Sequence, residues 1–354
     1  MLREADLGPP RSALTSHLVG APARSPWLIS RAEDLIWFHG AVLAGLALLA
    51  FFALGPKLTD ATFSAAHPAV LALLLWGIFF DGTHVLGTWT HARAASVSRW
   101  ALLLVLVGPA VAVVDALALT PHPSQLGNAG WLFQGFLLVA YLWAYFHLVR
   151  QHYGFVALYR RRANATDPVE RRLETLILWA GCLYPYLRYS LSAAYAQSGL
   201  PVLLPDAALP GLRVALDVGF AIGGAALLAG LIVRSKGKPG PRHLLIAIVI
   251  AFHVAVFALL DNLLVITATL TVFHNLQYHR IVWDHAQKQG RIPASGLLRY
   301  LGLGVALGAA WYGPRILGVA LAPSDLVRNA LLGLGWGVAF HHYFVDGRIW
   351  KRPA

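Results

Sequence analysis

Several uninterrupted apolar stretches of this sequence exceed the roughly 18 to 20 residues that an α-helix needs to cross a bilayer. Of the 354 residues, 58% are hydrophobic and only 12% are charged. A chain with this composition buries its apolar side chains largely in lipid. These features predict an all-α fold, a polytopic bundle of transmembrane helices.

The apolar pattern predicts about ten spans. The break "LLDNLL" at 259–264 divides a stretch that is too long for one ordinary span. At the start of the first span, Ser30 and Glu33 have the spacing of a capping box, which satisfies free amide groups at a helix start. The expected helices lie near 35–55, 69–91, 100–120, 129–152, 173–197, 211–234, 242–260, 262–285, 297–321 and 327–350.

The formal net charge of +12 is explained better by topology than by nucleic acid. Lys and Arg gather in the N-terminal tail and after every second expected helix, and the opposite side holds few of them. Since short cytoplasmic loops are enriched in these residues, we expect both termini in the cytoplasm, in a bacterial inner (cytoplasmic) membrane. We divide the chain into a retained tail at 1–34 and one transmembrane domain at 35–354. The basic loops are expected to contact membrane lipids, and no nucleic acid is expected as a partner.

Cys182 is the only cysteine, which excludes disulfides and cysteine-ligated metal centres within one chain. Any metal must therefore use histidine, carboxylate or backbone ligands. The sequence contains no phosphate-binding glycine loop, serine elbow or HExxH motif. These absences argue against ATPases, serine hydrolases and metalloproteases of those types.

Nine of the 15 histidines form four groups. On the ten-helix interpretation each group ends an inward-running helix, so all four lie on the cytoplasmic side and could build one site. Aspartates accompany three of the groups, and intramembrane ionisable residues are functional candidates. The groups are His84 with His91, His147 with His152, His274 with His279 and His285, and His341 with His342.

Helical spacing refines the site. Asp81, His84 and His91 fall on one stripe, but the two histidines lie about 10 Å apart along the axis, which suits two metals or a ligand and its partner. Asp346 follows His342 by four residues, a spacing at which a carboxylate can orient a ligating imidazole.

The pairs "FHLVRQH" and "FHNLQYH" share the spacing of His, four residues, His. This spacing separates the two rings by about 140° on a regular helix, so both reach one centre only if the helix distorts or ends there. Gly154 makes such an ending possible after His152.

A plainer interpretation treats these histidines as part of an interfacial belt beside Trp, Tyr and Arg, but a belt would place histidines on both faces. His253, in mid-helix, is expected to be a satisfied polar residue rather than a ligand. His39 and His243 could join the cluster or reach the interface.

By class of motif, the chain resembles the histidine-box integral-membrane di-iron oxygenases, such as fatty-acyl desaturases, hydroxylases and alkane hydroxylases. The two spaced pairs match one box of that family, and His341/His342 resembles the paired histidines of the others. The residues before that pair are Val338 and Ala339, where the family has a third histidine, and His84/His91 has no counterpart. The resemblance implies a cytosol-facing centre with two iron ions, a lipid-like substrate and an electron-donor protein. It assigns metal-ligand roles to His84, His91, His147, His152, His274, His279, His341 and His342, with Asp81 and Asp346 as ligands or orienting groups.

Three alternatives stay open. A zinc-dependent membrane hydrolase or transferase needs only three or four of these ligands and an open position for water. A haem redox protein would use axial histidines on facing helices. A transporter would need a polar path across the bilayer, and the outer half of the expected bundle has few ionisable side chains.

Overall fold

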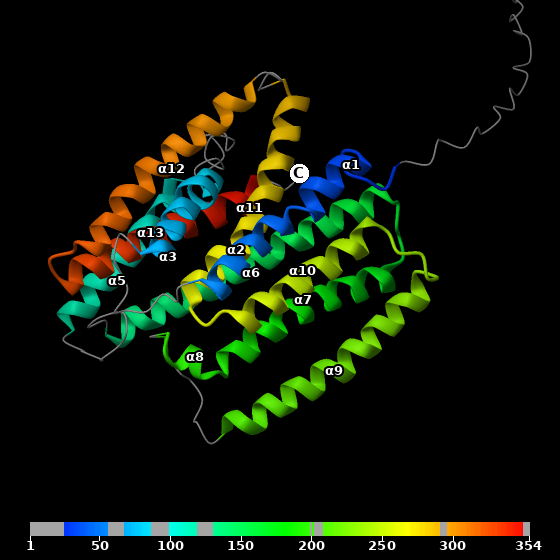
Figure 1. Cartoon of the computed structure of the whole chain (residues 1–354), viewed down its shortest axis with the longest axis horizontal. Helices are drawn as coiled ribbons and strands as arrows, with labels where there is room; N and C mark the ends of the chain where they lie inside the picture. Colours follow the sequence, from blue (N-terminus) through cyan, green and yellow to red (C-terminus); the bar gives the residue numbers. More distant parts are fainter. Residues whose placement is uncertain are drawn as a thin grey trace, which may run out of the picture.

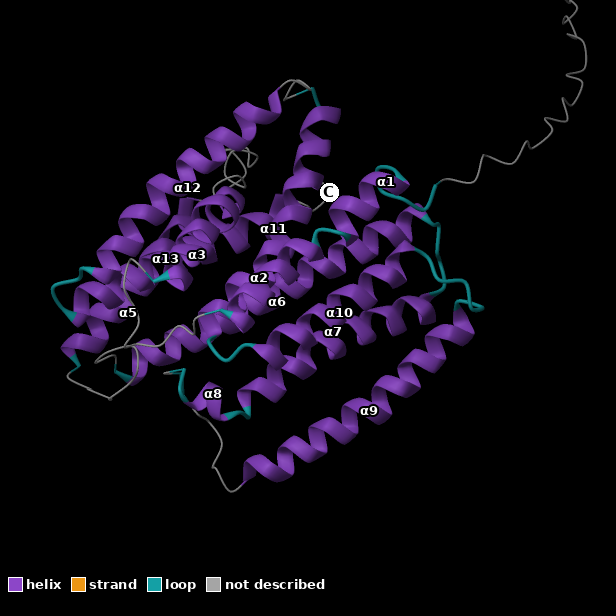
Figure 2. Cartoon of the chain, in the orientation of Figure 1, coloured by secondary structure: helices purple, strands orange, loops and turns teal. Residues whose placement is uncertain are grey.

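The structure is a computed structural model that describes residues 25–55, 67–85, 99–118, 130–198, 200–201, 208–290 and 296–349. All regular elements in these ranges are helical, and none of the described residues forms a strand (Figure 2). The elements are α1 (Arg31–Asp34), η1 (Leu35–His39), α2 (Val42–Leu54), α3 (Pro68–Trp76), η3 (Gly77–Asp81), η5 (Arg99–Leu103), α5 (Leu104–Leu117), α6 (Trp131–Arg162), α7 (Pro168–Ser190), α8 (Ala193–Ala196), α9 (Leu209–Arg234), α10 (Pro241–Leu259), α11 (Leu263–Lys288), α12 (Leu297–Ala320) and α13 (Asp325–Ile349).

Six of the described helical segments are long and apolar enough to cross a membrane. The structure therefore fits a helical membrane protein, as the composition predicts. The further helices α7, α11, α12 and α13 lie outside these six, so the count of ten spans stays a prediction. The six segments are Arg31–Leu54, Pro68–Val85, Trp100–Leu117, Trp131–Arg162, Leu209–Arg234 and Pro241–Leu259.

The first long segment begins where the capping pattern predicts. The Ser30 hydroxyl accepts a hydrogen bond from the Glu33 backbone N–H at 3.2 Å. The Glu33 carboxylate does not return to the cap and instead pairs with Arg280 of α11 at 3.0 Å. The cap therefore forms in part, and the acidic residue joins two helices that are far apart in sequence.

The break at 259–264 is also confirmed. Helix α10 ends at Leu259, and the Asn262 side chain accepts from the backbone N–H groups of Leu264 and Val265 at the start of α11. This N-cap satisfies two free donors of the new helix and fixes the point where it begins. One apolar stretch thus becomes two helices.

The helices pack side by side in a tilted bundle (Figure 1). Helix α9 lies at one edge against α7, and α7 packs on α10. In the middle, α11 contacts α2, α6 and α10, and at the other side α13 packs on α5 while α12 packs on η3. The central helices carry most of the buried apolar core.

Two close backbone contacts position α13. A Cβ atom on Gly108 of α5 would lie 2.1 Å from the Gly333 carbonyl oxygen, and one on Gly337 would lie 2.3 Å from the Val105 carbonyl oxygen. Only glycine permits this approach, because any side chain would push the two backbones apart. The contact brings α13, and His342 with it, into the interior of the bundle.

Candidate metal centre

His147 and His152 lie well inside a long helix, which corrects the expectation that this group ends its helix, whereas the helices α11 and α13 end close to the predicted positions 285 and 350. Helix α6 runs through Gly154 as far as Arg162, and α11 continues past His279 to Lys288. At 1.5 Å per residue, about 22 Å of helix separates His147 from the end of α6. The candidate site lies inside the bundle, where its rings are buried.

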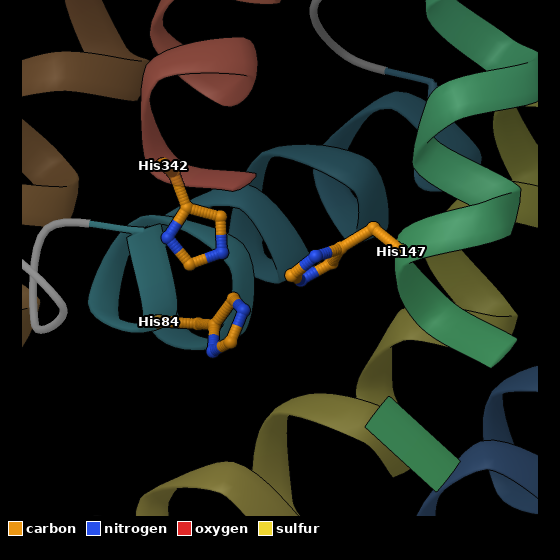
Figure 3. Close-up of side chains that lie close together, drawn as sticks. All are labelled: His84, His147 and His342. Carbon is orange, nitrogen blue, oxygen red and sulfur yellow. The ribbon is translucent and has the colours of Figure 1, made fainter. Parts of the chain in front are cut away.

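Four of the predicted ligands converge, each from a different helical segment. His84 ends the segment Pro68–Val85, His147 lies on α6, His274 on α11 and His342 on α13. All four side chains are buried, with exposed fractions between 0% and 8%. Figure 3 shows three of them, His84, His147 and His342, directed toward one another. One ligand atom from each of these three lies within 4.8 Å of the other two. His274 is not in this group of three, and it is included here because its Nε2 atom lies 3.3 Å from Nε2 of His84.

The four imidazole rings form a closed four-ring circuit, in which each ring lies next to two of the others. Ring-centroid distances are 4.9 Å for His84–His274, 5.3 Å for His274–His147, 5.2 Å for His147–His342 and 4.5 Å for His342–His84. His84 and His147 lie at opposite corners, 6.5 Å apart. The Nε2 atoms of His84 and His274 are 3.3 Å apart.

These spacings fit ligands of one metal ion. With a metal–nitrogen distance of about 2.0–2.1 Å, the centroid of an imidazole lies about 3.2 Å from the metal. Two such rings are then separated by about 4.5 Å at a right angle, 5.2 Å at the tetrahedral angle and 6.4 Å when opposed. The four edges of 4.5 to 5.3 Å lie near the right-angle and tetrahedral values, and the His84–His147 separation of 6.5 Å lies near the value for opposed rings.

The hydrogen bonding of the rings also fits a metal. Nε2 of His147 and both ring nitrogens of His342 are buried without a hydrogen-bond partner among the described residues. A buried polar atom left without a partner costs about 1–3 kcal/mol. Coordination would satisfy these atoms, and neutral imidazoles suit iron, zinc or copper. The same crowding leaves no room for a porphyrin between the rings, so the haem alternative does not fit this site.

A second pair of histidines lies beside the four. The His152 ring is 6.3 Å from His274 and 5.9 Å from His253, and both His152 and His253 have an exposed fraction of 0%. The hydroxyl of Tyr145 lies 2.8 Å from Nδ1 of His253. His253 is thus partly the satisfied polar residue expected from sequence, although it neighbours a predicted ligand.

His279 is not placed as a ligand. Its Nε2 lies 3.0 Å from the Thr83 hydroxyl and its Nδ1 lies 2.9 Å from the Tyr300 hydroxyl, so hydrogen bonds occupy both nitrogens. His341 precedes His342 and lies about 100° away around α13, outside the group of mutually close ligand atoms. His91 lies outside the described residues.

The two predicted aspartates are near the centre without belonging to the group of close ligand atoms. Asp81 accepts a hydrogen bond from the Tyr312 hydroxyl, and the Arg315 guanidinium lies 4.5 Å above the Tyr312 ring. Asp346 is buried one turn beyond His342 on α13. In this arrangement Asp81 joins α12 to the segment that carries His84.

A second group of possible ligands, Glu170, Glu174 and His243, is better described as an ion-pair network. Arg160 and Arg242 both bind Glu174, and Arg242 also binds Glu170 at 2.6 Å. The Gly240 backbone N–H donates to Nδ1 of His243, so Nε2, which lies 3.1 Å from Glu174, carries the proton. Two guanidinium groups thus already neutralise the two carboxylates.

Of the histidines left open by the sequence, neither His39 nor His243 joins the centre. The ring nitrogens of His39 lie 2.9 Å from the carbonyl oxygens of Asp34 and Pro241. Among residues that the sequence did not single out, Tyr343 stacks on His147 at 4.4 Å and Thr83 bonds to His279. Their only sequence signal is that they adjoin His342 and His84.

A small hollow opens next to the centre. It has a cavity volume of about 30 Å³ and is lined by the polar residues Thr83, His279 and Tyr300 together with apolar residues of α12. One of its lining residues, His279, has its ring centroid 6.4 Å from that of His84. The apolar lining consists of Leu301, Leu303, Gly304 and Leu307.

Comparisons with family models, with curated proteins and with solved structures found no match to this chain.

Proposed function

We propose that the protein is a membrane-bound, metal-dependent oxidoreductase that acts on a hydrophobic, lipid-like substrate. The observation that carries the proposal is the circuit of four buried imidazoles, whose spacings match those around one metal ion. In this proposal His84, His147, His274 and His342 hold the metal. When bound, iron at such a site supplies oxygen activation.

The residues around the four ligands have separate roles in the proposal. The apolar helices exclude water, and Tyr343 stacks on His147 and fixes its ring. The reactive part of a hydrophobic substrate would approach the centre from the hollow on the α12 side, which has leucines along its wall and Thr83 at its polar side. An electron-donor protein would dock on the cytoplasmic face, and the ten-span topology with both termini inside belongs to the same proposal.

The number of ions distinguishes two versions of this site. The four-ring circuit suits one ion. A second ion, as in the two-iron expectation, would have to use His152 and His253, whose centroids are 5.9 Å apart. We propose one ion at the four-ring circuit, with iron as its identity.

One observation favours a zinc-dependent hydrolase or transferase as the second candidate. The 3.3 Å between the Nε2 atoms of His84 and His274 equals the nitrogen–nitrogen edge of about 3.3 Å that tetrahedral zinc requires. Against zinc, the 6.5 Å diagonal between His84 and His147 is that of opposed ligands.

Elemental analysis and an absorption spectrum of the purified full chain test the proposal. We expect one iron per chain without a porphyrin band, and loss of the metal in His147→Ala and in His342→Ala. His341→Ala is the matched control, because it removes the neighbouring imidazole from the same helix and leaves the circuit intact. A single zinc would select the second candidate. A chain that stays metal-free after anaerobic reconstitution with iron or zinc, or an H342A variant that keeps its metal, would refute the metal centre.

A further inference from the structure

The start of α7 lies level with the ends of two candidate membrane spans. Asp167, the residue before α7, lies 3.9 Å from Arg234, the last residue of α9. Arg242, in the first turn of α10, binds Glu170 in the first turn of α7 at 2.6 Å. Since α9 and α10 are both long and apolar enough to cross a membrane, the first two turns of α7 lie at the level where these two helices would leave it.

Two exposed arginines, Arg171 and Arg172, lie in this part of α7. Within the ranges that the structure describes, neither guanidinium group makes a hydrogen bond or an ion pair. The nearby carboxylates of Glu170 and Glu174 already bind the two arginines of the buried ion-pair network. Two positive charges at the membrane boundary are therefore available to an anion from outside the chain.

These two arginines line a surface hollow together with Thr175 and Leu176, and we call it the α7 hollow. Its volume is about 280 Å³. The Thr175 hydroxyl donates to the Arg171 backbone carbonyl oxygen at 2.7 Å, so its proton is used within the helix. The donors that the hollow offers to a ligand are therefore the two guanidinium groups, with an apolar side chain next to them.

An exposed apolar stripe continues from the α7 hollow along the same helix. Leu176 is 52% exposed and Leu183 is 46% exposed. They follow Arg172 by four and eleven residues, so the three side chains lie within about 40° of one another around α7. At 1.5 Å per residue, Leu183 lies about 16 Å along the axis from Arg172, close to half of the roughly 30 Å hydrocarbon core of a bilayer. The stripe thus has the length of one leaflet.

We propose that the α7 hollow binds one anionic phospholipid. Its phosphate lies on Arg171 and Arg172, and one acyl chain lies along Leu176 and Leu183. Guanidinium groups suit phosphate because their N–H donors match its oxygens in a bidentate geometry. A free phosphate ion would use the arginines but not the leucines, whereas a phospholipid uses both. A headgroup with net negative charge is preferred, because a zwitterionic one would bring its own cation next to the two arginines.

Native mass spectrometry of the purified full chain, titrated in detergent with phosphatidylglycerol, tests the site by counting the lipids bound to each chain. We expect one phosphatidylglycerol to bind before any further lipid, and phosphatidylcholine with the same acyl chains to bind at least about fivefold more weakly. Equal affinity for the two lipids would overturn the proposal, whatever the behaviour of the variants. If inorganic phosphate at the same concentration displaces the lipid, the hollow is a site for free phosphate and the phospholipid proposal is wrong.

The double variant Arg171→Gln/Arg172→Gln removes both charges from exposed positions and keeps residues of similar helix propensity. Each cation near the membrane surface contributes roughly a fivefold gain in affinity for anionic lipid, so we expect phosphatidylglycerol to bind about thirtyfold more weakly. Lys236→Gln/Lys238→Gln is the matched control, because it removes two exposed charges from the loop between α9 and α10 and leaves the α7 hollow intact. Losses of affinity within about threefold of each other in the two double variants would indicate diffuse attraction and overturn the site.

Discussion

Replacing Glu174 by alanine should destabilise the protein more than removing any other ion pair described here. The Glu174 side chain has an exposed fraction of 0% and binds Arg160, Arg242 and, at 3.1 Å, His243. Arg242 would keep Glu170 as a partner, but Arg160, whose side chain is 9% exposed, would keep only a 3.5 Å contact with the Arg171 carbonyl oxygen. One guanidinium would therefore be left buried and almost unpaired.

Breaking a buried pair by removing one partner typically costs about 3–5 kcal/mol, and we expect a loss of that size for E174A. Glu33→Ala is the matched control. It removes a carboxylate from Arg280, but the Glu33 side chain is 41% exposed, and such pairs contribute about 0–1 kcal/mol. Glu174→Gln keeps the shape and one acceptor oxygen and should fall between the two. The free energy of unfolding in mixed micelles, titrated with a denaturing detergent, measures the difference. If E174A and E33A differ by less than about 1 kcal/mol, the description of the network as a buried charge cluster is wrong.

Two further predictions concern packing and topology. Gly333→Ala should destabilise the bundle and weaken metal retention, because its Cβ would lie 2.5 Å from the Gly108 backbone. The control is Gly135→Ala on α6, where a Cβ meets nothing within 4 Å; it should be neutral or up to about 1 kcal/mol stabilising through helix propensity. Equal unfolding free energies for the two variants would contradict the close contact of α5 and α13. Thr166→Cys, in the exposed loop after α6, should react with a membrane-impermeant thiol reagent only from the cytoplasmic side. Ser324→Cys, between α12 and α13, should react only from the opposite side, and the buried Cys182 should not react from either side. The reverse pattern of labelling would overturn the proposed topology.

Much of the helical framework follows from local sequence. The apolar stretches predict an all-helical chain, Ser30 marks the start of the first long segment, and Asn262 separates α10 from α11. Each of these features acts over a few residues, through backbone capping or through the apolar length of a helix. The end of α6 is different, because Arg160 in its polar final turn binds Glu174 of another helix, α7.

The candidate site, too, follows in part from local sequence and in part from the packing of the helices. The spacing and grouping of histidines predicted convergence, and the structure brings His84, His147, His274 and His342 together. It could not be read from sequence that His279 bonds to Thr83 and Tyr300, or that Asp81 bonds to Tyr312. These partners are between about 20 and 230 residues apart in sequence, beyond the reach of any helical periodicity.

The sequence by itself determined that this chain forms apolar helices, where several of them begin, and which residue types are available for a metal. Only the tertiary structure decided which imidazoles share a centre and which are used elsewhere. The physical reason is that helical periodicity fixes the direction of a side chain relative to its own axis, whereas the rotation and depth of each helix are set by packing against its neighbours. Gly108 and Gly333 illustrate this, since their backbone contact sets the position of α13 and so brings His342, rather than His341, to the centre.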